Sequence, residues 1–191
     1  MANTSFTSWA LKGLSVNIAL IRNAISSLSG PCTRPDLRDV LSKFHIPTEG
    51  LSYSEIVFVG EPEENVLRFT TEEDCCTPID CMEALRKAFP DLKIRYLDEC
   101  FEDDVFETND KEGEFFPERY ALDFDTTLAP DADPLYYFKS EKELLDFVEQ
   151  TFGKKYASAR AVSANLEYDL SDDDENAFVS LHEAEIIETL R

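Results

Sequence analysis

The sequence predicts an α+β protein in which helices cover one face of a mostly antiparallel sheet. Segments with the alternation of β-strands are interspersed with segments whose apolar residues follow a helical period, and several strands come in consecutive pairs. With 43% hydrophobic and 30% charged residues, the composition is that of a globular protein. A chain of 191 residues is long enough for one buried core, so we expect a single α+β domain over residues 1–191.

The first strand and the first two helices are expected near the N-terminus. Residues 4–12 are rich in threonine and aromatic residues, which favours a strand. Apolar residues then recur at steps of four and three, as in an amphipathic helix: Leu14, Ile18, Ile21, Ile25 and Leu28. Ser15 should cap this helix, and Gly30 should end it in the left-handed conformation. Residues 35–45 predict a shorter helix that Pro47 ends.

Two β-hairpins are expected. Residues 54–60 and 65–71 are β-branched and aromatic runs separated by a short polar segment. Residues 104–109 and 114–125 flank the turn signal Asp-Lys-Glu-Gly at 110–113, and we expect them to pair with each other.

A helix over 78–89 and a strand over 92–100 are expected between these hairpins. Thr77 should cap the helix, with Pro78 in its first turn. Its predicted buried face consists of four residues: Ile79, Met82, Leu85 and Phe89. The strand alternates, but Asp98 interrupts its apolar face.

The C-terminal third is less regular. A helix over 140–152 is opened by a Ser-x-x-Glu capping box and ended by Gly153. Residues 156–170 fit either a helix or a pair of strands. Residues 177–187 fit a strand better than a helix, because β-branched, aromatic and aliphatic residues alternate there.

The order of these elements contains the β-α-β-β-α-β succession of ferredoxin-like folds, with one extra helix before the second strand. We therefore expect a ferredoxin-like core over about residues 4–125. An extra β-hairpin is part of this prediction. A helix and an acidic C-terminal extension should follow over 126–191.

The segment 69–100 resembles the centre of the YubB-type ferredoxin-like family, uncharacterised proteins of bacteria, phages and mobile elements. The matching motifs are Phe89-Pro90-Asp91-Leu92 and Tyr96-Leu97-Asp98-Glu99, whereas the family's tryptophan is missing between Thr71 and Pro78. The resemblance covers roughly residues 54–125. It implies a fold and a mobile-element context, and it supplies no catalytic residue.

The charge is strongly negative and uneven. Forty acidic residues stand against 18 basic ones, for a net charge of −22. Residues 1–48 are net +3, whereas 60–83, 98–133 and 167–191 are net −7, −12 and −8. Such a surface repels nucleic acids and anionic membranes and attracts basic proteins or cations. We therefore predict a basic protein partner, no nucleic acid and no membrane.

The cysteines indicate a reducing compartment. Five is an odd number, and the N-terminus lacks the pattern of a signal peptide, so we predict a cytoplasmic protein with reduced thiols. Cys75, Cys76 and Cys81 stand near a predicted helix start, where thiolates are favoured. Their spacing lacks the four soft ligands of a zinc site. We expect structural free thiols and no cofactor or metal, with a redox or metal role for these three left open.

The densest acidic run, residues 98–107, is the predicted partner-binding site. We expect five acids to line one hairpin there: Glu99, Glu102, Asp103, Asp104 and Glu107. Strict alternation would place Glu102 and Asp104 on one face with Cys100 and Phe106. It would place Glu99, Asp103 and Glu107 on the other face with Phe101.

The sequence thus favours a non-enzymatic interaction protein, an accessory factor of a phage or mobile element that engages a basic partner through an acidic face. One alternative is a metal-dependent hydrolase that uses carboxylates such as Asp98, Asp103 and Asp123. Another alternative is a highly soluble protein whose acidic face has no specific partner. No catalytic motif decides between these readings.

Overall fold

The computed structural model describes residues 4–74, 77–171 and 178–188. They form an α+β structure with mostly antiparallel sheets, as predicted. The chain divides into two compact units. The first unit holds the residues up to Phe116 together with the end of the chain from Ile186, and the second is Pro117–Glu185. Each unit has its own hydrophobic core, and the boundary between them precedes the one expected after residue 125.

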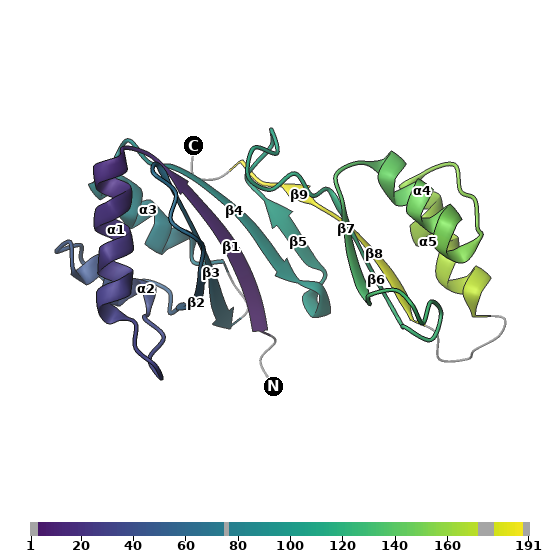
Figure 1. The fold of residues 1–191 in the computed structure, drawn as a ribbon, viewed down its shortest axis with the longest axis horizontal. Helices are drawn as coiled ribbons and strands as arrows, with labels where there is room; N and C mark the ends of the chain where they lie inside the picture. Colours follow the sequence, from purple (N-terminus) through teal and green to yellow (C-terminus); the bar gives the residue numbers. More distant parts are fainter. Residues whose placement is uncertain (1–3, 75–76, 172–177, 189–191) are drawn as a thin grey trace. The chain divides into compact units, whose positions relative to one another are not determined.

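The first unit contains a six-stranded sheet with the order β2-β3-β1-β4-β5-β9 (Figure 1). Neighbouring strands from β2 to β5 are antiparallel. The expected pairing of 54–60 with 65–71 is confirmed as the β2–β3 hairpin. The strands are β1 (Thr4–Lys12), β2 (Glu55–Val59), β3 (Val66–Asp74), β4 (Lys93–Cys100), β5 (Val105–Thr108) and β9 (Glu185–Ile186).

Three helices, α1 (Ser15–Leu28), α2 (Leu37–Ser42) and α3 (Ile79–Ala88), cover one face of this sheet (Figure 1). Their apolar sides meet Trp9 and Leu11 of β1 in a single core. Helix α2 is shorter than expected, because it starts only after Asp36, whose side chain accepts a hydrogen bond from the amide of Arg38 at 2.6 Å.

Two of the predicted helix caps are wrong. Helix α1 is not capped by Ser15; Leu14 occupies the N-cap position, and its amide donates to Asp91 Oδ2 at 2.8 Å. Asn17 Nδ2 donates to the other oxygen of Asp91 at 2.6 Å. Thr77 does not cap α3 either, because Pro78 is the N-cap residue and the Thr77 hydroxyl bonds to Asp98.

The C-terminal end of α1 also differs from the prediction. Ser29 is the C-cap residue, and its amide donates to the carbonyl of Ile25 at 3.0 Å. Gly30 forms a bridge with Thr33. The described glycines with positive φ are Gly50, Gly113 and Gly153, so Gly30 does not have the left-handed conformation that was expected.

The expected hairpin between 104–109 and 114–125 does not form. Asp110 is buried and accepts hydrogen bonds from the amides of Phe115 and Phe116 at 2.6 and 3.0 Å, which folds the chain back on itself. At Asn109 the side chain, in place of the backbone, pairs with β4. It accepts from the amide of Tyr96 and donates to the carbonyl of Ile94. The turn signal thus begins a connection out of the first sheet.

The second unit has a three-stranded antiparallel sheet with the order β7-β6-β8. The strands are β6 (Tyr120–Phe124), β7 (Leu135–Phe138) and β8 (Val179–Glu183), and the helices are α4 (Glu141–Phe152) and α5 (Ala159–Leu170). An aromatic cluster around Phe124 forms much of the core. The capping of α4 by Ser140 and its left-handed end at Gly153 are confirmed.

Helix α5 decides the open assignment of residues 156–170 in favour of a helix. The strand preference at 177–187 is confirmed for its described residues by β8 and β9. Strand β7 was not predicted. Among the described residues, no helix combines the length and the apolar character that crossing a bilayer requires.

Candidate functional site

The helix-free face of the first sheet carries a row of acidic and aromatic residues. Directly opposed residues of neighbouring antiparallel strands lie on the same face. Glu55 opposes Glu72, Glu72 opposes Phe6, and Phe6 opposes Glu99. Trp9 and Leu11 alternate with Phe6 along β1 and point into the helix-covered core, so this row points away from the helices.

The row continues into two neighbouring positions. Thr4 opposes Asp74 at the start of β1, and Phe58 opposes Thr70 on β2 and β3. Phe6 is 43% exposed and Phe58 is 61% exposed. We call this surface the acidic–aromatic face, which consists of Thr4, Phe6, Glu55, Phe58, Glu72, Asp74 and Glu99.

The other end of the same sheet face is covered by its own chain. Lys12 and Lys93 both form ion pairs with Glu114, and Lys12 lies 2.9 Å from it. The Arg68 guanidinium lies 5.2 Å from the centre of the Phe115 ring. The acidic–aromatic face is therefore the part of this side that the 109–116 segment leaves open.

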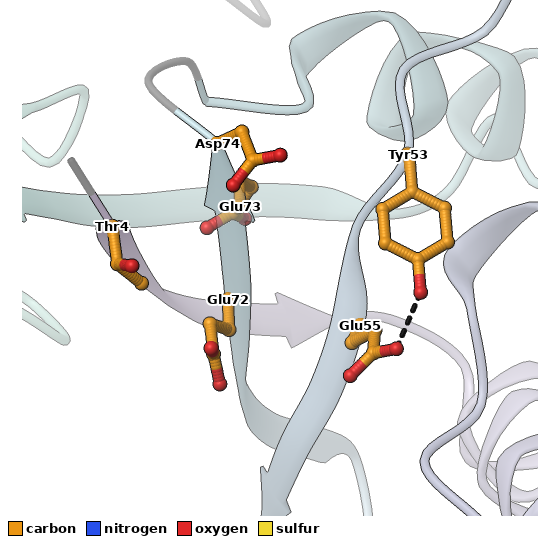
Figure 2. A pocket seen from close by; sticks show the side chains of 6 residues that line it. All are labelled: Thr4, Tyr53, Glu55, Glu72, Glu73 and Asp74. Atoms are coloured by element: carbon orange, nitrogen blue, oxygen red, sulfur yellow. Dashed lines mark hydrogen bonds between the residues drawn. The ribbon is translucent and has the colours of Figure 1, made fainter. Parts of the chain in front are cut away.

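A cavity of about 80 Å³ lies at one end of the acidic–aromatic face (Figure 2). It is lined by Thr4, Tyr53, Glu55, Glu72, Glu73 and Asp74. The Tyr53 hydroxyl donates to Glu55, and this bond raises the pKa of Tyr53 to about 12. The Arg38 guanidinium lies 5.0 Å from the centre of the Tyr53 ring. The phenol therefore stays neutral and holds the Glu55 carboxylate in place.

Negative charge exceeds positive charge at this cavity. Glu55 and Glu72 oppose each other directly, an arrangement that destabilises a sheet when both residues are ionised. Arg34 Nη1 lies 2.8 Å from Glu72 Oε2, but both side chains are solvent-accessible, and such pairs contribute only ~0–1 kcal/mol. Asp74 adds a third carboxylate, so the lining favours a cationic ligand group.

A second set of polar groups lies on the helix side of the same strands. We call it the buried carboxylate cluster, which consists of Ser5, Thr7, Ser54, Thr71, Glu73, Thr77 and Asp98. Asp98 is buried and accepts from Ser5 Oγ at 2.5 Å and from Thr7 Oγ1 at 3.2 Å. The hydroxyl of Thr77 donates to its other oxygen. Three hydroxyl donors therefore satisfy the Asp98 carboxylate.

Glu73 is less well satisfied than Asp98. Its Oε1 accepts from Ser54 Oγ at 3.0 Å and from the Thr71 hydroxyl, which in turn accepts from Trp9 Nε1 at 2.9 Å. Its Oε2 is buried and has no hydrogen-bond partner among the described residues. Burial raises the pKa of Glu73 to about 7, with a smaller contribution from the nearby Asp98 carboxylate, against the lowering effect of its hydroxyl partners. Glu73 thus titrates near neutral pH.

The predicted partner-binding acids do lie along one hairpin, formed by β4 and β5, but not in rows. Glu99 is on β4 and Glu107 on β5, where it accepts a hydrogen bond from the Tyr96 hydroxyl at 2.9 Å. Glu102 and Asp103 lie in a 3-10 turn, and Asp104 ends it with φ of 58°. Three of the five acids therefore belong to the connection, where strand spacing does not apply.

The predicted faces of this hairpin are also wrong. Glu99 opposes Phe106, and Asp98 opposes Glu107. Glu99 and Glu107 therefore lie on opposite faces. Phe106 shares a face with Glu99, whereas the prediction placed it on the face of Cys100. The connection between the two strands has four residues. Odd-numbered residues of one strand therefore pair with even-numbered residues of the other, and alternation along the sequence does not predict the faces.

The three hydrolase candidates lie in three different elements. Asp98 belongs to the buried carboxylate cluster, Asp103 lies in the turn, and Asp123 is on β6 of the second unit. Burial raises the pKa of Asp123. Within the described ranges, no group of three or more His, Cys, Asp or Glu side chains could hold a metal ion.

The described cysteines are free thiols. Cys32 is exposed, whereas Cys81 and Cys100 are buried. Burial raises the pKa of Cys81 to about 12, so its position in the first turn of α3 does not activate it as a thiolate. Cys75 and Cys76 lie outside the described residues.

Sequence reasoning found only Glu99 of the acidic–aromatic face. The predicted strand 65–71 stopped before Glu72, Glu73 and Asp74, whereas β3 continues to Asp74. One feature of the sequence could have indicated that Glu73 points inward: it is in phase with Leu67 and Phe69, which point into the core.

Comparison with protein-family models, with curated proteins and with solved structures found no match to this chain. The resemblance to the YubB-type family stays a prediction.

Proposed function

We propose that the protein is a non-enzymatic interaction module that binds a basic partner through the acidic–aromatic face. The observation that carries this proposal is the cross-strand row of Glu55, Glu72, Phe6 and Glu99, in which an exposed aromatic ring stands between carboxylates. Carboxylates pair with Lys and Arg side chains, and aromatic rings accept their apolar stems and cationic heads. Both kinds of contact are available at neighbouring positions.

The spacing of the face suits an extended basic segment. Adjacent strands are ~4.8 Å apart, and successive same-face residues along a strand are ~6.8 Å apart. Glu72 and Asp74, which follow each other on this face of β3, therefore have the spacing of alternate side chains in an extended peptide, whereas the row across the strands repeats at the shorter strand spacing. A nucleic acid is disfavoured as the partner, because its phosphates would meet the same carboxylates.

We further propose that the first unit has a ferredoxin-like core. Its support is the element order β1-α1-β2-β3-α3-β4 together with the antiparallel strand order β2-β3-β1-β4 and three helices on one side. Helix α2 would be an insertion. The proposal extends to a YubB-type accessory factor of a mobile element in the cytoplasm, which rests on the sequence motifs, the charge, the cysteine count and the N-terminal pattern.

A binding assay with two variants tests the interaction proposal. The face variant combines Phe6→Ser, Glu55→Gln and Glu72→Gln. The control variant neutralises the three predicted partner-binding acids that lie in the β4–β5 turn, through Glu102→Gln, Asp103→Asn and Asp104→Asn. The probe is a fluorescent synthetic peptide rich in lysine and arginine, with a glutamate-rich peptide as the negative probe.

We expect the face variant to bind the basic peptide at least ~10-fold more weakly than the wild type, a loss of ~1.4 kcal/mol. The turn variant should bind like the wild type, and binding should weaken with added salt. Unchanged affinity of the face variant across a salt series would show that the acidic face serves only solubility. Loss of binding in the turn variant alone would place the interface at the β4–β5 turn.

A further inference from the structure

Glu73 lies directly behind the cavity of the acidic–aromatic face. Its neighbours along β3, Glu72 and Asp74, both line that cavity (Figure 2). Ser54, which donates to Glu73 Oε1, stands between Tyr53 and Glu55, which line it as well. Glu73 itself is a lining residue, yet it is only 3% exposed. A change in its charge is therefore felt by four groups of the cavity wall.

The surroundings of Glu73 hold negative charge and neutral hydroxyls. From β1 come the hydroxyls of Ser5 and Thr7, from β3 that of Thr71, and from β4 the carboxylate of Asp98. Ser54 and Thr77 contribute further hydroxyls, and the described hydrogen-bond partners of both buried carboxyls are all hydroxyl groups. Glu55, Glu72 and Asp74 add negative charge from the cavity side, where Arg34 is bound to Glu72.

Two buried carboxyls with hydroxyl partners alone are costly when both are ionised, so one of them is expected to hold a proton. The hydrogen bonds decide which. Asp98 accepts three hydroxyl donors over both oxygens, whereas Glu73 Oε2 accepts none from the described residues. Glu73 is therefore the group that carries the proton.

We propose that Glu73 binds one proton in the free protein and releases it to solvent when a cationic side chain occupies the cavity, so that partner binding is coupled to pH. This coupling rests on the function proposed above. A cation among Glu55, Glu72 and Asp74 stabilises a negative charge on Glu73, which their own negative charges oppose while the cavity is empty. The pKa of Glu73, raised to about 7 by burial, places the exchange near neutral pH.

Linkage gives the expected size of the effect. If the cationic partner binds the ionised form, its apparent affinity is scaled by the ionised fraction of Glu73 in the free protein. That fraction rises about 10-fold between roughly pH 6 and pH 8 for a group that titrates near 7. We therefore expect the affinity to rise by up to ~10-fold over this interval.

The test is isothermal titration calorimetry of the full chain with the lysine- and arginine-rich peptide, in buffers that differ in ionisation enthalpy. The wild type should release up to one proton per peptide at lower pH within this interval and gain affinity as the pH rises. Glu73→Gln, a neutral mimic of the protonated acid, should bind without proton release or pH dependence. Glu112→Gln, an exposed acid outside the face, is the matched control and should behave like the wild type.

A second measurement covers the case in which Glu73→Gln fails to fold. The carboxyl ¹³C shift of Glu73 in the wild-type protein should titrate near 7 without peptide and at lower pH with it. Binding with proton release that persists in Glu73→Gln, or a Glu73 carboxyl that titrates at its ordinary value of 4.5, would overturn the inference while leaving the proposed function standing. Absence of peptide binding would overturn the coupling together with that function.

Discussion

Glu55 and Glu72 oppose each other directly across β2 and β3, on the side of the sheet that carries no helix. A sheet gains nothing from this pair, since like charges in opposed positions repel. The Tyr53 hydroxyl and the Arg34 guanidinium each stabilise one of the two carboxylates. Under the function proposed above, the pair is a charge arrangement that serves binding at some expense of stability.

Glu55→Gln should separate these two effects. The amide oxygen can still accept from Tyr53, and the Arg34–Glu72 pair is untouched, so only the repulsion is removed. We expect the free energy of unfolding to stay constant or to rise by up to ~1 kcal/mol, with weaker binding of a basic peptide. Urea denaturation measures the first quantity and fluorescence anisotropy the second. A loss of stability above ~1 kcal/mol would mean that Glu55 is a structural residue.

Phe89 provides a test of the first core. Full burial was expected from its helical phase, and truncation would then cost ~3–5 kcal/mol. The ring is in fact only partly buried and packs edge-to-face on Phe44, with ring centres 5.1 Å apart. We expect Phe89→Ala to cost less, ~2 kcal/mol, and Leu85→Ala, a buried neighbour on α3, to cost ~2–5 kcal/mol. A larger loss for Phe89→Ala than for Leu85→Ala in urea denaturation would contradict this ranking.

Local signals in the sequence were sufficient for many elements. Ser140 and Gly153 bound α4 as predicted, because a cap and a left-handed glycine act within one or two turns. The cap of α1 was missed because Asp91, which supplies it, is 77 residues from Leu14. Neither the spacing nor the residue type at Ser15 contains that information.

The candidate site was harder to predict from the sequence than the helices, because it depends on which residues of neighbouring strands oppose each other. Phe6, Glu72 and Glu99 come from three strands, and only their pairing brings them into one row. The linear density of acids pointed instead to residues 102–104, which form a turn. Residue type does not distinguish Glu73 and Asp98 from surface acids. They differ only in being buried, on the same side of the sheet as Trp9 and Tyr96.

The thiols should differ strongly in reactivity. Cys32 is exposed, whereas Cys81 is buried and has a pKa raised to about 12 by that burial. We expect iodoacetamide to modify Cys32 in the native protein and to leave Cys81 unmodified until urea unfolds the chain. Peptide mapping by mass spectrometry resolves the two sites. Equal labelling of both under native conditions would contradict the buried position of Cys81.

Asp98 should be the most sensitive carboxylate of the first unit. Asp98→Ala leaves the buried hydroxyls of Ser5 and Thr7 and the partly buried hydroxyl of Thr77 without their acceptor, and each unsatisfied buried group costs ~1–3 kcal/mol. We expect a loss of at least ~3 kcal/mol in urea denaturation. Glu102→Ala in the exposed turn is the control and should stay within ~0.5 kcal/mol of the wild type. A small effect of Asp98→Ala would show that water readily replaces the carboxylate.

Glu73 gives the stability of the protein a pH dependence of unusual sign for a carboxyl group. Its folded-state pKa of about 7 lies above the ordinary value of 4.5 that applies after unfolding. Between these values the folded protein holds a proton that the unfolded chain has lost, so stability falls as the pH rises through this interval. The stabilising contribution is complete below about pH 4.5 and is lost above about pH 7. Its full size is at most ~3.5 kcal/mol, because one pKa unit corresponds to ~1.4 kcal/mol.

The difference between the wild type and Glu73→Gln isolates this contribution from the other acids. The glutamine does not ionise, so the free energy of unfolding of Glu73→Gln relative to the wild type should increase by up to ~3.5 kcal/mol between about pH 4.5 and pH 7 and then remain constant. Urea denaturation of both proteins at several pH values measures the difference directly. A difference that is constant over this whole range would mean that Glu73 has the same pKa in the folded and unfolded chain, and that its burial leaves its proton affinity unchanged.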